Sequence, residues 1–165
     1  MRLRISIASG FTLVESMVAV ALTAMFLGSV FTMSVSSMDA IRCAKEYTAA
    51  GQVLEQRSES LRIANWQEVT SADWVAANIL NTDAPGAAPL KNLSETLTLV
   101  PYGSTTLGNT TLARSGGNTT IVNSIPLLTE NAVKVVWTLN FTGAPNNRAV
   151  TRQIVTILAQ GGVAK

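Results

Sequence analysis

The most prominent pattern in the chain is a long apolar run close to its N-terminus. Residues 16–38 are 23 consecutive uncharged residues, and Glu15 is the only charged residue between Phe11 and Met38. As a helix rising 1.5 Å per residue, this run would be roughly 35 Å long, enough for a hydrocarbon core of about 30 Å. We therefore predict a membrane-spanning helix over residues 11–38.

The predicted helix continues past the apolar run with a different surface. Residues 39–62 are rich in Ala, Glu, Gln, Arg and Leu, and the first proline of the chain is Pro85. Apolar residues recur along one stripe at helical spacing, at Tyr47, Ala50, Leu54 and Leu61. We predict a single helix of roughly 78 Å over residues 11–62, whose second half is amphipathic and packs on the rest of the chain.

The segments between the predicted secondary-structure elements are short or polar. Residues 70–80 predict a second helix, with Thr70 and Asp73 in a capping pattern at its start. Residues 85–89 begin and end with proline and predict a turn or linker. Residues 103–120 are mostly Gly, Ser, Thr and Asn, which predicts an exposed loop or a short edge hairpin.

Alternation of apolar and polar residues predicts β-strands after the linker. One strand ends at Pro101 and places four residues on one face: Leu93, Glu95, Leu97 and Leu99. Residues 133–141 and 149–158 predict two longer strands joined as an antiparallel hairpin. We expect Trp137 and Phe141 to lie in the core.

These elements predict an α+β fold. A long N-terminal α-helix packs its amphipathic half on a small antiparallel β-sheet formed within residues 63–165. With 165 residues, the chain has room for one modest domain in addition to the span. The expected parts are therefore 11–38 as the span, 39–62 as the helix continuation and 63–165 as the C-terminal domain.

Composition and charge argue against several classes of function. Charged residues are 13% of the chain, and the net charge of +2 equals the contribution of Arg2 and Arg4. No basic stripe interleaved with aromatic residues is present, so nucleic acid is not expected as the main partner. The lack of histidine excludes an imidazole base and histidine-containing zinc sites, and Cys43 alone cannot form a disulfide within the chain.

The sequence also lacks motifs for catalysis. It contains no nucleophile, phosphate-loop or metal-ligand pattern, and its acidic residues are scattered singly. We therefore expect that the protein is not an enzyme and that it has no cofactor and no metal site.

The residues before the apolar run predict its orientation. Residues 1–10 read MRLRISIASG, and the two arginines predict a cytoplasmic N-terminus with the C-terminal domain across the membrane. A secretory signal peptide is the simpler alternative for such a segment. Its apolar stretch usually covers only about 7 to 15 residues before a cleavage site with small residues, whereas the helical pattern here continues much further.

Residues 10–15, which read GFTLVE, resemble the cleavage and methylation signature of type IV prepilins and type II secretion pseudopilins. The resemblance implies that a bacterial prepilin peptidase cuts after Gly10 on the cytoplasmic side and methylates Phe11, the new N-terminal residue. Residues 1–10 would then be the leader, and Glu15 the fifth residue of the mature chain. A looser likeness to minor pilins and pseudopilins lies at the predicted helix end, in Leu54-Glu55, Ser60-Leu61-Arg62 and Trp66.

A carboxylate at the position of Glu15 requires a physical reason. In an apolar helix it costs about 2.5 to 3.5 kcal/mol at the bilayer centre and less near the interface. In a filament with a core of packed helices, the amine of Phe11 in one subunit would need an anion, which Glu15 of a neighbour could supply. Because each buried charge is costly alone, this pairing would select the register of added subunits. The alternative is an ordinary carboxylate at the membrane interface.

The resemblance implies a type IV pilin-like fold and a structural role. The expected function is that of a minor pilin or minor pseudopilin, a subunit of a type IV pilus or a type II secretion-like filament. Expected partners are the prepilin peptidase, other pilin or pseudopilin subunits, the inner-membrane assembly platform and, before assembly, the lipid bilayer. The expected location is the inner membrane, as a single-pass protein with a periplasmic C-terminal domain, and then a filament of the cell envelope or surface.

Two alternatives stay open. A major pilin would share the same features. A membrane-tethered extracytoplasmic binding module that never assembles would need the apolar helix but not a free amine at Phe11, so processing after Gly10 separates the two classes. Because nothing after Glu130 is acidic, the calcium site of the major pseudopilins is not expected.

Overall fold

The computed structural model describes residues 12–103 and 108–161. The chain divides into two compact units, one ending at Ala40 and one beginning at Ile41. Helix α1 (Leu13–Ile63) supplies the described secondary structure of the first unit and continues into the second. The single helix predicted over 11–62 is therefore confirmed within the described residues.

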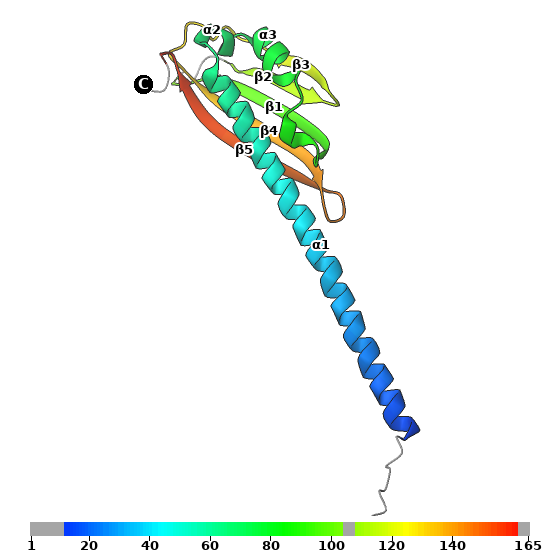
Figure 1. The fold of residues 1–165 in the computed structure, drawn as a ribbon. Coiled ribbons are helices and arrows are strands. Elements are labelled where there is room, and N and C mark those ends of the chain that lie inside the picture. The colour runs from blue at the N-terminus through cyan, green and yellow to red at the C-terminus, as the bar shows by residue number, and fades with distance from the viewer. Residues whose placement is uncertain (1–11, 104–107, 162–165) are drawn as a thin grey trace, which may run out of the picture. The chain divides into compact units, whose positions relative to one another are not determined.

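The described part of the second unit combines the end of α1 with four short helical segments and five strands, which Figure 1 shows in their arrangement. The helical segments are α2 (Trp66–Val69), α3 (Ala72–Val75), the π-helix η1 (Ala76–Leu80) and the 3-10 helix η2 (Pro85–Ala87). The strands are β1 (Lys91–Pro101), β2 (Thr110–Ser115), β3 (Asn118–Asn123), β4 (Ala132–Gly143) and β5 (Arg148–Ala159).

The strands of the described chain form one antiparallel sheet in the order β3-β2-β1-β4-β5. The central strand β1 pairs with β2 on one side and with β4 on the other, where Leu97 lies opposite Trp137. Strands β4 and β5 form the predicted hairpin and pair along their whole length. Ala132 lies opposite Ala159 at one end, and Gly143 lies opposite Arg148 at the other. The α+β layout predicted for the chain is thus confirmed.

The core lies between one face of the sheet and the part of α1 in the second unit. From α1 the side chains of Ala50, Val53 and Leu61 are almost wholly buried. They belong to the same apolar cluster as residues of four strands: Leu97, Leu99, Leu112, Val133, Trp137, Leu139, Phe141 and Leu158. Trp137 and Phe141 are both buried, as expected. Burying such large apolar side chains is the main favourable term in folding.

The helix predicted over residues 70–80 is confirmed over 72–80, where α3 passes directly into η1, but its predicted start and cap are wrong. The cap of α3 is Ser71, whose Oγ accepts the N–H of Trp74 at 3.3 Å. Thr70 ends α2, with its hydroxyl donating to the carbonyl of Trp66 at 2.7 Å. Two adjacent hydroxyl residues compete for the same local bonds, and the pattern alone did not decide between them.

Residues 103–120 were predicted to form either an exposed loop or a short edge hairpin, and the exposed loop is not what the structure shows. In its described part, residues 108–120, the segment contains β2 and most of its hairpin partner β3 rather than an exposed loop. Strand β2 is internal to the sheet, and its Leu112 and Arg114 are buried. Polar composition concealed this strand because two of its three inward side chains, Thr110 and Arg114, are polar and alternate with small residues on the other face.

The core assignment predicts a clear contrast between two apolar truncations in the sheet. Leu97→Ala removes a side chain that is 0% exposed and should lower the free energy of unfolding by about 2–5 kcal/mol. Val155→Ala, at a residue 51% exposed on β5, should cost less than about 1 kcal/mol. All three tryptophans lie after residue 63, so near-UV circular dichroism during denaturant unfolding of the full chain in micelles reports on this domain. Equal losses for both variants would contradict the assigned core.

Candidate functional site

The first turn of α1 is capped by Thr12, which places Glu15 at the third helical position. The N–H of Glu15 donates to Oγ1 of Thr12 at 3.3 Å, and the N–H of Ser16 donates to the carbonyl of Thr12 at 3.1 Å. A carboxylate in the first turn also interacts favourably with the helix dipole. Thr12 and Glu15 therefore also stabilise the start of α1 locally, apart from any role in assembly.

The described part of the first unit has no buried side chains. Every residue from position 12 to 38 is exposed, and the large apolar side chains are strongly so, with Phe31 76% exposed. By length and composition, α1 is the one helix among the described residues that could cross a membrane. This agrees with the predicted span, and Glu15 is the only charge on that surface up to Met38.

Several hydroxyl groups on this apolar surface bond to their own helix. Thr23 donates to the carbonyl of Ala19 at 2.8 Å, and Ser29 donates to the carbonyl of Phe26 at 2.7 Å. Thr32 and Ser37 make equivalent bonds to carbonyls three and four residues earlier. A hydroxyl that is satisfied in this way needs no water, which makes it compatible with an apolar medium.

The predicted processing site lies outside the described residues. Gly10 and Phe11 both precede Thr12, where the description begins. Cleavage after Gly10 and methylation of Phe11 therefore stay predictions. The same holds for the pairing of Glu15 with a neighbouring amine, which involves a second chain.

A buried charge network inside the second unit was not predicted. Glu95, whose side chain is 1% exposed, accepts two bonds of 3.0 Å from Nε and Nη2 of Arg57 on α1. Its Oε1 also accepts a bond of 3.1 Å from Nη1 of Arg114 on β2. Arg114 in turn contacts the carboxylate of Asp83, whose side chain is 89% exposed. The four side chains together carry no net charge.

Arg57 also holds the connection between η1 and β1. Its guanidinium donates to the carbonyls of Ile79 and Thr82, the latter at 2.7 Å. Each charged group removed from water costs several kcal/mol, so a buried pair is tolerated only when further hydrogen bonds satisfy its remaining atoms. The network meets this requirement except at Nε of Arg114, which is buried and has no partner among the described residues.

The sequence contained a partial signal for this network. Glu95 was placed on the same face as Leu97 and Leu99, which implies a buried carboxylate that needs a cation. Arg57 falls between Leu54 and Leu61, which were assigned to the apolar stripe of the helix. What the sequence did not reveal is that these two residues face each other across the core, because a pairing 38 positions apart depends on the fold.

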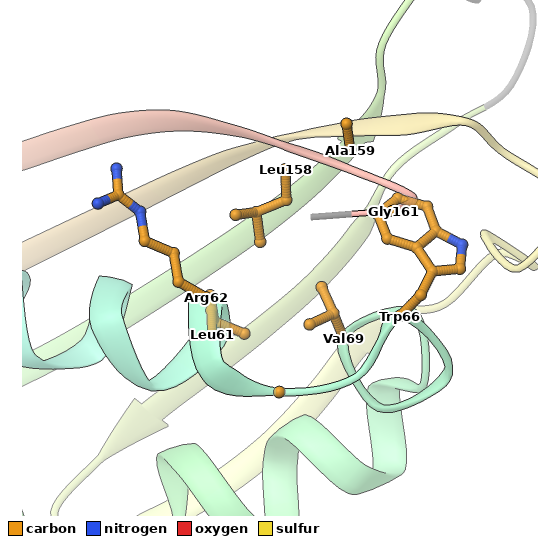
Figure 2. Close-up of a pocket in the computed structure, with 8 residues that line it drawn as sticks. Leu61, Arg62, Trp66, Val69, Leu158, Ala159 and Gly161 are labelled. Atoms are coloured by element: carbon orange, nitrogen blue, oxygen red, sulfur yellow. The ribbon is translucent and has the colours of Figure 1, made fainter. Parts of the chain in front are cut away.

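A small hollow lies where α1 ends against β5. Its volume is about 340 Å³, and Figure 2 shows Leu61, Val69 and Leu158 around it, with Trp66 at its side and Arg62 at its rim. The indole N–H of Trp66 donates to the carbonyl of Leu128 at 3.3 Å. This lining includes no carboxylate, thiol or hydroxyl that could carry out catalysis.

No group of three or more His, Cys, Asp or Glu side chains that could hold a metal ion is found within residues 12–103 and 108–161. Comparison of the chain with protein-family models, curated proteins and solved structures gives no match. The function is therefore argued from the residues and their geometry.

The buried network predicts that two ion pairs of similar length contribute very differently to stability. Glu95→Gln leaves the charges of Arg57 and Arg114 buried without their anion and should cost about 3–5 kcal/mol. The matched control is Glu59→Gln, which breaks the 2.9 Å pair with Arg62, whose side chains are 58% and 46% exposed. That surface pair should contribute at most about 1 kcal/mol.

Both variants are compared with the unmodified chain by denaturant unfolding in micelles. A loss at Glu95 no larger than the loss at Glu59 would show that the network does not stabilise the domain.

Proposed function

We propose that this chain is a structural subunit of a type IV pilin-like filament, as a minor pilin or minor pseudopilin. It would be made as a precursor in the inner membrane, cut after Gly10 and assembled through its apolar helix. The observation that carries the proposal is a helix whose residues 12–38 are all exposed and whose only charge over that length is Glu15. Such a surface requires an apolar environment that its own chain does not supply.

The layout of the second unit supports the same proposal. One face of α1 beyond Ala49 is buried on the sheet, so a single helix is partly a domain element and partly a surface for other molecules. A simple membrane anchor has no need for a carboxylate at the head of the helix beside a GFTLVE sequence. A filament subunit uses that carboxylate, because an incoming amine at Phe11 would otherwise lie uncompensated in an apolar core.

Processing after Gly10 is the first test. The mature protein purified from membranes should have the mass of residues 11–165 plus one methyl group, measured by intact-protein mass spectrometry. Gly10→Val, which adds a branched side chain beside the scissile bond, should leave the precursor uncut because a peptidase active site must approach the backbone closely. An intact Met1, or a cut far from Gly10 in the unmodified chain, would refute the pilin proposal and favour a membrane-tethered module.

The role of Glu15 is tested by its removal from the processed chain. Glu15→Ala should leave membrane insertion unchanged and lower incorporation into filaments by about tenfold or more, because an unpaired buried charge costs about 3–5 kcal/mol. Glu55→Ala, an exposed carboxylate on the same helix, is the matched control and should assemble normally. Sheared filament fractions and membrane fractions are quantified by immunoblot. Normal incorporation of Glu15→Ala would eliminate the pairing role.

A further inference from the structure

The turn between β4 and β5 is attached to the first turns of α1 in the second unit. Glu46 accepts the N–H of Ala144 through its carboxylate at 2.8 Å. The thiol of Cys43, which is half-buried, donates to the carbonyl of Ala144 at 3.0 Å. These bonds hold the start of β5 beside the helix segment that contains Tyr47.

Two arginines of β5 gather on the ring of Tyr47. Arg148 donates to the phenol oxygen at 2.8 Å, and its guanidinium carbon lies 5.9 Å from the ring centroid. The guanidinium carbon of Arg152 lies 4.3 Å from the same centroid, in cation–π contact. The two positive charges therefore lie within about one Debye length, roughly 10 Å at 0.1 M salt, and repel each other.

Within the described residues, neither arginine forms an ion pair with a carboxylate. Arg152 also donates no side-chain hydrogen bond within this part of the chain. The nearby carboxylate of Glu46 is directed to the N–H of Ala144. Both arginines are exposed, so most of their N–H groups are available to a ligand.

The surrounding charges are separated along the second unit. Lys91 lies at the same end of the sheet, opposite Thr142 next to the β4–β5 turn, and Lys45 lies on the adjacent part of α1. Other carboxylates of the unit lie nearer the end of α1, in α2 and α3, or just before β4: Glu55, Glu59, Glu68, Asp73 and Glu130. Around Tyr47 the positive side chains of Lys45, Lys91, Arg148 and Arg152 outnumber the carboxylate of Glu46, although charges nearly cancel over the chain.

We propose that Arg148, Arg152 and Tyr47 form a site for the phosphate of an anionic phospholipid headgroup. Guanidinium forks match the oxygen geometry of a phosphate group, and an anion between the two arginines removes their repulsion. Tyr47 lies nine residues after Met38, the last residue of the apolar run, so the site is close in sequence to the predicted span. Tyrosine is itself enriched where membranes meet water.

This inference rests on the membrane anchoring in the proposed function and not on filament assembly. The full chain is reconstituted in vesicles of phosphatidylcholine alone, or of three parts phosphatidylcholine to one part phosphatidylglycerol. Amide hydrogen exchange is measured for residues 144–152. Exchange should be several-fold slower in the anionic vesicles, and raised salt should remove the difference, because each arginine near an anionic surface shifts the docking equilibrium by about fivefold.

Matched variants identify the groups responsible. Arg148→Gln combined with Arg152→Gln should exchange at the same rate in both kinds of vesicle. Lys134→Gln, which removes one exposed positive charge from the other end of the sheet, should behave like the unmodified chain. Unchanged near-UV circular dichroism of the tryptophans shows that each variant is folded.

Three outcomes would overturn the proposal. Equal exchange in both vesicles for the unmodified chain excludes a site that prefers an anionic headgroup. Persistence of the difference in the double glutamine variant places the effect elsewhere. If exchange instead becomes slower as more protein is added per vesicle, and equally so in neutral vesicles, the arginines bind carboxylates of a second copy of the chain. Flotation with neutral vesicles reports insertion separately, so a failure of membrane anchoring is distinguishable from a failure of this site.

Discussion

A carboxylate on the core side of a strand has lost its water and must receive hydrogen bonds from protein groups instead. For Glu95 these come from Arg57 on α1 and Arg114 on β2, so one side chain of the central strand connects a helix and a neighbouring strand. Apolar contacts are not directional, whereas a two-bond pair between guanidinium and carboxylate has a fixed geometry. The bonds to Glu95 therefore specify where the helix lies along β1, and the apolar side chains pack around that alignment.

The same two arginines position a connection that has little regular structure of its own. Between η1 and β1, the chain is held at the carbonyls of Ile79 and Thr82 by Arg57 and at Asp83 by Arg114. Gly86 lies close to α1, where a Cβ would come within 3.5 Å of the carbonyl of Ala49. The connection is thus fixed by contacts to α1 and β2, which explains how the 10 residues between η1 and β1 cover this part of the core.

Elements with a strong repeating pattern were predictable from the sequence, and pairings between distant residues were not. The length of α1, the buried face of β1 and the β4–β5 hairpin each follow from local periodicity. The charge network requires knowing that α1 crosses β1 beside Glu95, and the arginine pair on Tyr47 joins positions about a hundred residues apart. Total charge concealed that pair, because the sum over the chain contains no information on how charges are separated in space.

The hydroxyls on the apolar half of α1 have a consequence for how that helix can change surroundings. Thr23, Ser29, Thr32 and Ser37 each bond to a carbonyl of the same helix and need no outside partner. Moving the helix between lipid and the side chains of other helices would then break none of these bonds. For these four residues the exchange would involve mainly dispersion contacts, which are similar in strength in hydrocarbon and in packed protein. These hydroxyls therefore do not oppose a transfer of the segment from lipid to packed protein. Glu15 is the group along it for which the change of medium has a large electrostatic cost.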